Sequence, residues 1–278
     1  MMNKRYFKGL ILWMVLVLTA CGAGESTTDH EEAGPSESRT LLTAGEVIRQ
    51  VADTFEEAAS YSVKGETQQE LERTLNGEVS IMKSEMITEA QWIKQPSQHH
   101  MLMDIKTDGM LPMTMEQYVI PGTGHFSRIG EDGWVKLAGE ELDGGIADMQ
   151  MHPQSLEYLL GVLERLQGDV LFTQEGNYYT MTLELPEEEL LRIDEMTNAG
   201  LEALEPSHMS IQLLKRMKVS LKADKDSLLL NQLLVDLEID IGGGEDVMIQ
   251  RKIDRSTFFN FNGIDAIELP PEVIETAR

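Results

Sequence analysis

Residues 232–241 read QLLVDLEIDI, and this stretch decides the fold class. Its apolar side chains recur at every second position, at Leu233, Val235, Leu237, Ile239 and Ile241. A period of two is typical of an antiparallel strand that buries one face and leaves the other in water. Three glycines at 242–244 then turn the chain, and Val247–Ile253 returns as a second strand. The C-terminal third is therefore predicted to be antiparallel sheet.

Similar strand patterns extend toward the N-terminus from this hairpin. Short apolar runs between Gly, Pro and Asn-Gly turn signals predict a first strand that opens at Tyr61. Val170–Leu185 is predicted to be a hairpin that turns at residues 175–177. The other predicted strands are Val79–Ile93, Met101–Lys106, Thr114–Ile120 and His125–Leu137.

Three segments are predicted to be helices, one before the strands and two between them. Leu42–Ala59 and Pro153–Leu166 carry apolar residues that recur every three or four positions. Pro186–Leu204 begins Pro-Glu-Glu-Glu, a charge pattern that favours a helix N-terminus. The predicted class is α+β, an antiparallel sheet with helices on one face. Residues 42–278 show no second linker and no internal repeat, so we expect one domain.

The first 20 residues are typical of a signal peptide. Lys4, Arg5 and Lys8 precede the apolar run Gly9–Leu18, which ends in Thr19-Ala20. Gly9–Ala20 would make about 18 Å of helix, too short for a membrane span of about 20 apolar residues. Leu18-Thr19-Ala20-Cys21 resembles the lipobox of bacterial lipoproteins, in which the cysteine is lipidated and the chain is cut before it. The alternative is a free cysteine after an ordinary signal peptide.

Cys21 is the only cysteine of the 278 residues, as lipidation predicts. Residues 21–41 are therefore interpreted as the lipidated cysteine and a disordered linker, because Gly22–Thr40 contains no large apolar residue. The expected location is the outer face of the cytoplasmic membrane. The formal net charge of -25 argues against nucleic acid as a partner, since such partners need clustered Lys and Arg.

Short motifs along residues 43–277 resemble those of a lipoprotein family of Gram-positive bacteria whose function is unknown. They are Ala59-Ser60-Tyr61-Ser62-Val63, a strand with Tyr118, Gly133-Trp134-Val135-Lys136, Phe261-Asn262-Gly263-Ile264 and Ile267–Val273. That family is similar in turn to the LolA/LolB and LppX/LprG lipoproteins. The resemblance implies a half-barrel of antiparallel strands, with helices packed on its concave side over an apolar cavity. It supplies no ligand-binding motif.

Methionine gives a separate indication of a binding surface. Nine of the 17 methionines lie between residues 82 and 151. Flexible thioethers adapt to irregular apolar ligands, but they also fill ordinary cores, and the sequence leaves both interpretations open. The candidate ligand-binding residues on the predicted strands are Met82, Met86, Trp92, Met101, Met103 and Met115.

The sequence shows no catalytic, cofactor or metal motif. The six histidines have no metal-ligand spacing and are expected at the surface or in turns: His30, His99, His100, His125, His152 and His208. Asp236-x-Glu238-x-Asp240 resembles a calcium loop, but Ile241 and Val247 stand where that loop needs glycine and glutamate. We therefore expect no enzyme. Two hypotheses remain: a membrane-anchored carrier or receptor for an apolar ligand such as a lipid, and an envelope sensor that binds a protein partner.

Overall fold

The structure, a computed structural model, describes residues 42–137, 153–186, 188, 190, 214–241 and 247–277. They belong to one compact unit, Leu42–Arg278. The strands, in chain order, are β1 (Ser60–Leu75), β2 (Glu78–Ile93), β3 (Gln98–Thr107), β4 (Met113–Ile120), β5 (Gly124–Ile129), β6 (Val135–Leu137), β7 (Leu171–Glu175), β8 (Tyr178–Pro186), β9 (Leu214–Asp224), β10 (Leu230–Asp240) and β11 (Val247–Phe259).

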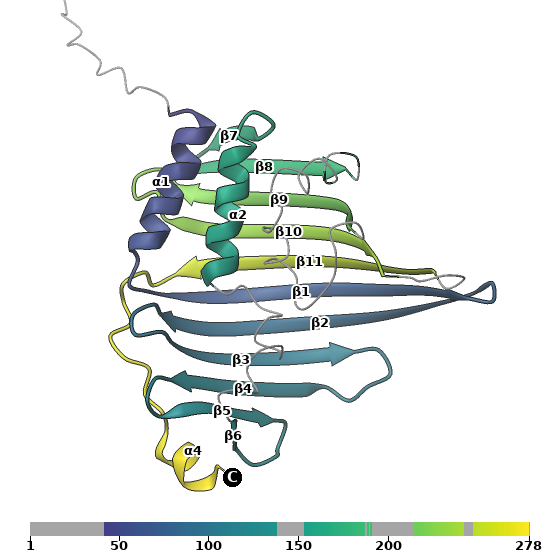
Figure 1. The fold of residues 1–278 in the computed structure, drawn as a ribbon, viewed down its shortest axis with the longest axis vertical. Coiled ribbons are helices and arrows are strands. Elements are labelled where there is room, and N and C mark those ends of the chain that lie inside the picture. The colour runs from purple at the N-terminus through teal and green to yellow at the C-terminus, as the bar shows by residue number, and fades with distance from the viewer. Residues whose placement is uncertain are drawn as a thin grey trace, which may run out of the picture. The chain divides into compact units, whose positions relative to one another are not determined.

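These strands form a single open sheet of the order β6-β5-β4-β3-β2-β1-β11-β10-β9-β8-β7 (Figure 1). Every neighbouring pair is antiparallel. The first and last strands, β1 and β11, meet in the middle of the sheet and are paired over most of their length. The predicted α+β class with an antiparallel sheet is confirmed.

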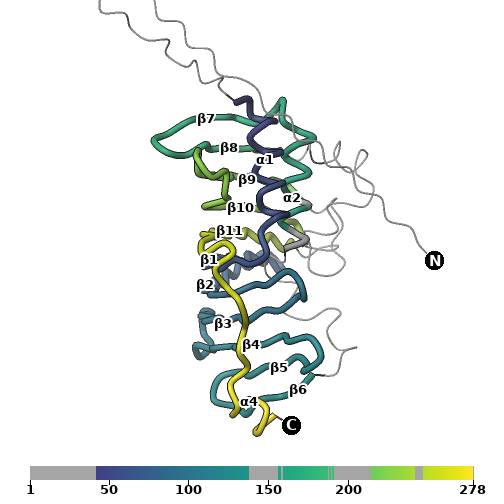
Figure 2. The backbone as a smooth tube through the Cα atoms, turned by 90° about the vertical axis from the view of Figure 1, so that its left-hand side faces the viewer, coloured from purple at the N-terminus to yellow at the C-terminus, as the bar shows by residue number. Residues whose placement is uncertain are grey.

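Two helices, α1 (Ala44–Glu57) and α2 (Pro153–Arg165), lie side by side over β7–β11 (Figures 1 and 2). Helix α1 begins in a capping box: the Thr43 N–H donates to Glu46 Oε2 at 2.8 Å, and the Glu46 N–H donates to Thr43 Oγ1 at 3.3 Å. At its other end, Lys94 Nζ donates to the Phe55 carbonyl oxygen at 2.6 Å, where a cation complements the helix dipole. Both ends of α1 are thereby fixed.

We call the side of the sheet that α1 and α2 cover the inner face, and the opposite side the outer face. Buried residues of both helices and of the inner face form one apolar cluster that extends from Leu183 on β8 to Met115 on β4. The four leucines that α2 contributes are buried, as its spacing predicted: Leu156, Leu159, Leu160 and Leu163. Each such burial stabilises the fold by about 1.5–3 kcal/mol.

The C-terminal segment packs elsewhere, around a smaller cluster that ends in α4 (Pro271–Thr276). Ile267 and Val273 join outer-face residues of β2, β4 and β5 in this cluster, together with Trp134. Asn262 fixes the start of the segment, because its Oδ1 accepts from the Ala59 N–H at 2.7 Å. The segment thus joins the α1–β1 junction to the edge of the sheet (Figure 2).

The structure departs from the sequence predictions in three strands. Segment 125–137 forms two strands, β5 and β6, because the turn at residues 130–134 separates them. β9 was not predicted, and β11 continues six residues past Ile253. Several predictions lie outside the described residues: the signal peptide, Cys21 with the linker at 21–41, most of the helix Pro186–Leu204, and the glycine turn at 242–244. Within the described ranges, no helix has the length and apolar character needed to cross a membrane.

Candidate functional site

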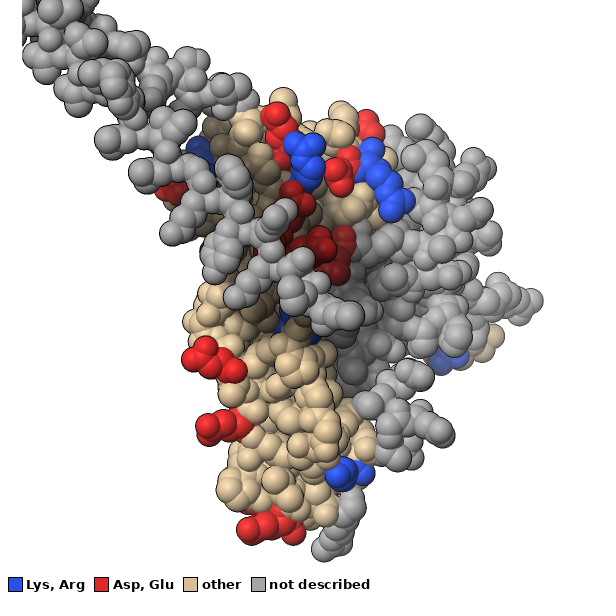
Figure 3. Space-filling view, turned by 60° about the vertical axis from the view of Figure 1, so that its left-hand side comes forward, with Lys and Arg blue, Asp and Glu red and all other residues tan. Residues whose placement is uncertain are grey.

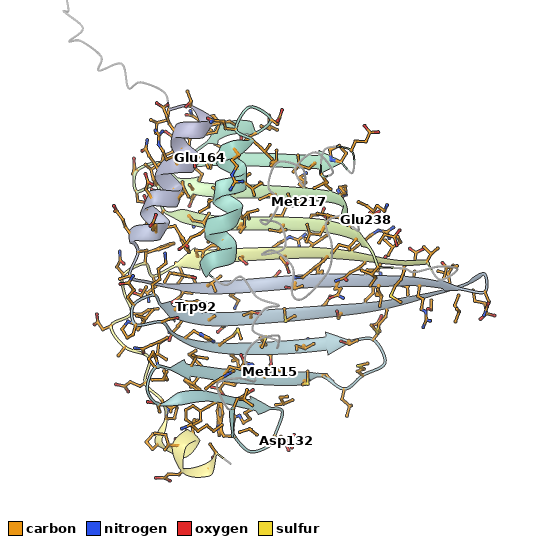
Figure 4. The ribbon with its side chains drawn as sticks, in the orientation of Figure 1. Trp92, Met115, Asp132, Glu164, Met217 and Glu238 are labelled. Atoms are coloured by element: carbon orange, nitrogen blue, oxygen red, sulfur yellow. The ribbon has the colours of Figure 1, made fainter. Side chains whose placement is uncertain are left out.

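The candidate ligand residues lie on the half of the inner face that β2–β5 form. Met82, Met86 and Trp92 point to the inner face of β2, opposite Leu71, Thr67 and Tyr61 of β1. Met103 of β3 lies directly opposite Met115 of β4. Figure 4 labels Trp92 and Met115 on this half and Met217 on the other.

Burial divides the candidates into two groups. Met101, Met103 and Met115 are buried in the main cluster, together with Trp92, and Met86 is half-buried against it. Met82 is 39 % exposed and lies beyond the end of β3, whose last residue pairs with Ser84. The structure therefore brings five candidates together on one surface and places Met82 at its exposed end. Their role in ligand binding stays a prediction.

We call the inner-face positions of β2–β5 from Met82 to Ile129 the methionine face. None of these described positions carries a charge. They are Met82, Ser84, Met86, Thr88, Ala90, Trp92, His99, Met101, Met103, Ile105, Thr107, Met113, Met115, Gln117, Val119, His125, Ser127 and Ile129. The outer face of the same strands carries Lys83, Glu85, Glu89, Asp104, Lys106, Glu116 and Arg128. In a chain this acidic, such a division marks a surface suited to apolar groups.

The space-filling view shows how charge is distributed between the two ends of the molecule. Charged side chains gather at the end of the molecule that carries α1 and α2, and few are visible over the end formed by β2–β6 and the C-terminal segment (Figure 3).

Among the residues that the structure describes, three on the inner face hold buried polar atoms that have no hydrogen-bond partner: Tyr61 Oη, Gln117 Oε1, and both ring nitrogens of His125. Gln117 and His125 lie on the methionine face, and each is only 5 % exposed. The amide nitrogen of Gln117 contacts Met115 Sδ at 3.4 Å. Buried polar groups are nearly always hydrogen-bonded, and leaving one unpaired costs about 1–3 kcal/mol. These atoms therefore call for a functional explanation.

The sequence prediction for two histidines was wrong. His125 and His99 are buried on the methionine face rather than placed at the surface or in turns. The His99 ring lies 4.3 Å from that of Trp92 between centroids. Gln117 was not identified at all. The available signal was its position, since Gln117 follows Met115 by two residues and alternate residues of a strand face the same side; both are buried.

His125 predicts a pH dependence of stability. Its burial between the apolar residues Val119 and Leu137, which lie directly opposite on β4 and β6, lowers its pKa below the ordinary value of about 6.5. Below that pH His125 is protonated in the unfolded chain but stays neutral in the folded chain until a lower pH. The free energy of unfolding should therefore fall as pH drops below about 6.5, by up to about 1.4 kcal/mol per pH unit.

Urea unfolding at pH 7.5, 6.5 and 5.5 measures this effect, with His125→Phe as the comparison. The substitution leaves every other ionisable side chain in place, so the difference between the two pH profiles isolates His125. Identical profiles would contradict the assignment of His125 as a buried neutral side chain.

The outer face of β3–β5 carries a polar network in which the partners satisfy one another. Glu116 accepts from Arg128 Nη2 at 2.6 Å, from His100 Nε2 at 3.0 Å and from Tyr118 Oη at 3.2 Å. Burial opposes ionisation of Glu116, but these hydrogen bonds outweigh it and lower the pKa of the carboxyl group. Arg128 also lies over the Trp134 ring, 4.9 Å from its centroid. Such a network fixes the strands and offers no free nucleophile.

In the segment that resembles a calcium loop, the carboxylates of Asp236 and Glu238 are paired with arginines. Asp236 binds Arg216 at 3.0 Å and Glu238 lies 3.5 Å from Arg251, both on the outer face of β10. Among the residues that the structure describes, no three His, Cys, Asp or Glu side chains gather as a metal site.

Comparison with known proteins identifies the domain. The model of a family of unknown function, DUF6612, matches residues 43–278. The chain belongs to this family. No curated protein matches the sequence. Two solved structures are similar over most of the DUF6612 domain. A DUF1329 family protein from Desulfovibrio piger is 10 % identical, with 81 % of this chain and 93 % of that chain covered and a TM-score of 0.24. A LolA superfamily protein from Nitrosomonas europaea is 9 % identical, with 84 % and 98 % covered and a TM-score of 0.20.

Several motif residues of this DUF6612 domain hold its parts together. Ser60 accepts from the Asn262 N–H at 2.8 Å through its carbonyl and from the Ile264 N–H at 3.1 Å through its hydroxyl. Trp134 and Tyr118 pack in the C-terminal cluster, with ring centroids 5.6 Å apart. These motifs therefore report on the fold rather than on a ligand.

Proposed function

We propose that this DUF6612 domain binds an apolar ligand, a lipid by class, on the methionine face. The observation that carries the proposal is the uncharged inner surface of β2–β5, where two buried side chains with unpaired polar atoms, Gln117 and His125, share one face with the methionines. Thioethers are flexible and polarizable, so such a surface adapts to hydrocarbon chains. The domain acts by binding, without chemistry of its own.

We further propose that the chain is a lipoprotein, anchored through Cys21 to the outer face of a Gram-positive cytoplasmic membrane. If residues 22–40 form the linker that their composition predicts, a coil of that length would reach roughly 25 Å and keep the domain close to the bilayer. A carrier in that position can exchange its ligand with the membrane surface.

A second function, protein interaction, has its own support. Large apolar side chains are exposed on the β1–β2 hairpin at Val79 and Ile81, and before β4 at Leu111. Exposed apolar patches of this kind mark interaction sites when they are contiguous. An envelope sensor would use such a surface and would need no ligand.

Met86→Trp separates the two functions. Met86 is half-buried at the border of the methionine face. The larger indole side chain of tryptophan should therefore occupy ligand space at little cost to folding. We expect the variant to bind 1-dodecylpyrene, a probe with a hydrocarbon tail and no polar head, about tenfold more weakly, with a nearly unchanged melting temperature. Fluorescence titration and thermal unfolding of the same preparations give both quantities.

Ile87→Trp is the matched control, because it adds a tryptophan to the adjacent exposed residue on the outer face. It should leave probe binding unchanged. If Met86 belongs to a filled core, Met86→Trp should instead cost about 1–3 kcal/mol of stability. That cost, together with no probe binding by the parent protein, would reject the carrier function and favour the interaction module.

A further inference from the structure

Gln117 and His125 are close neighbours on adjacent strands of the methionine face. Gln117 pairs with Ser127, and His125 pairs with Val119. The two residues are therefore diagonal partners, with Cα atoms about 7–8 Å apart. Both are more than nine-tenths buried, and their side chains share the inner face with Met115.

Their unpaired atoms define what a ligand must offer. A neutral imidazole has one N–H donor and one nitrogen acceptor, and Gln117 Oε1 adds a second acceptor. Burial keeps His125 neutral by lowering its pKa. A hydroxyl both donates and accepts a hydrogen bond, so it can bond to one atom of each residue at once.

The lack of charged residues on the described methionine face argues against an ionic head group. A carboxylate, phosphate or ammonium group at this position would be buried without a countercharge, since no described position of the methionine face carries one. Burying an unpaired ion is far more costly than burying a hydroxyl that finds two partners.

We infer that Gln117 and His125 form a polar anchor for the uncharged hydroxyl head of an amphiphile whose hydrocarbon chain lies along the methionine face. The inference rests on the proposed function and specifies its ligand class as long-chain alcohols and acylglycerols rather than fatty-acid anions or phospholipid head groups. The hydroxyl donates to Gln117 Oε1 and accepts from the ring N–H of His125. The hydrocarbon chain of the ligand contacts Met115 and Met103, the neighbouring cross-strand pair.

Three probes with one tail and different heads test the anchor: 1-dodecylpyrene, 12-(1-pyrenyl)dodecanol, and 12-(1-pyrenyl)dodecanoic acid at pH 8. We expect the alcohol to bind the parent protein about five to ten times more tightly than 1-dodecylpyrene, the gain of one or two net hydrogen bonds. The ionised acid should bind at least about tenfold more weakly than the alcohol.

Gln117→Met and His125→Phe should each remove the preference for the alcohol and leave 1-dodecylpyrene binding within about twofold. Gln91→Met is the matched control, because it makes the same change at an exposed outer-face position of β2. Gln117→Met also removes a buried unpaired acceptor, so its melting temperature should not fall. This keeps the binding result independent of folding.

The outcomes separate the two proposals. If 1-dodecylpyrene binds but the alcohol has no advantage, or if both variants keep that advantage, the anchor is overturned and the carrier function stands. Tightest binding of the ionised acid also overturns the anchor. If the parent protein binds none of the three probes, the carrier function itself fails.

Discussion

Cys21→Ser should abolish acylation of the protein and its lipid-dependent attachment to the membrane. Each buried CH₂ group contributes about 0.8 kcal/mol to membrane binding, and two acyl chains give a stable anchor where one gives only marginal binding. Serine lacks the thiol that would carry the proposed lipid, so the variant should not be labelled by a fatty-acid analogue and should not be extracted from membranes by detergent. The variant should appear in the medium or as an uncleaved precursor.

Metabolic labelling and cell fractionation measure this result, and Ser26→Ala in the same linker is the control that should behave like the parent protein. Because Cys21 is the only cysteine, no other thiol can take its place. Labelled, detergent-extractable Cys21→Ser protein would show that the anchor does not depend on this residue.

Regular periodicity made much of the fold predictable. The alternation in residues 232–241 identified β10, and helical spacing identified α1 and α2 to within a few residues. The pairing of β1 with β11 could not be predicted, because it joins segments nearly 200 residues apart and no local pattern records such a partner. Turn signals relate neighbouring strands only.

The candidate site was predictable only where its residues are apolar. The period of two along a strand puts Met82, Met86 and Trp92 of β2 on one face, and the register agrees. Gln117 and His125 are polar, and polar residues on a strand ordinarily face water. The cross-strand register of β4 and β5 shows that both lie on the buried face.

The sequence pattern did not show how far β11 extends, for a similar reason. Its inner face is polar in the middle, where Asp254 accepts from Thr67 Oγ1 at 2.6 Å and pairs with Lys252 at 2.9 Å. These side chains satisfy one another, so the strand continues without the apolar alternation that identifies strands in a sequence. Beyond them the inner face becomes apolar again at Phe258.

Phe258→Ala should therefore destabilise the protein strongly, and Phe259→Ala should not. The two residues are neighbours of identical chemistry, but Phe258 is 3 % exposed and Phe259 is 50 % exposed. The Phe258 ring packs at 6.3 Å from Phe55 of α1 and at 6.0 Å from Tyr61 of β1, measured between centroids. Truncating it leaves a cavity where helix and sheet meet.

We expect a loss of about 3–5 kcal/mol in the free energy of unfolding for Phe258→Ala, the cost typical of a buried Phe. For Phe259→Ala the loss should stay below about 1 kcal/mol, because truncation there opens no cavity. Urea unfolding of both variants and the parent protein gives the comparison. Equal losses, or a larger loss for Phe259→Ala, would mean that β11 pairs with β1 one residue out of register. Such a slip would turn every side chain of β11 to the opposite face, so this one comparison tests the central pairing of the sheet.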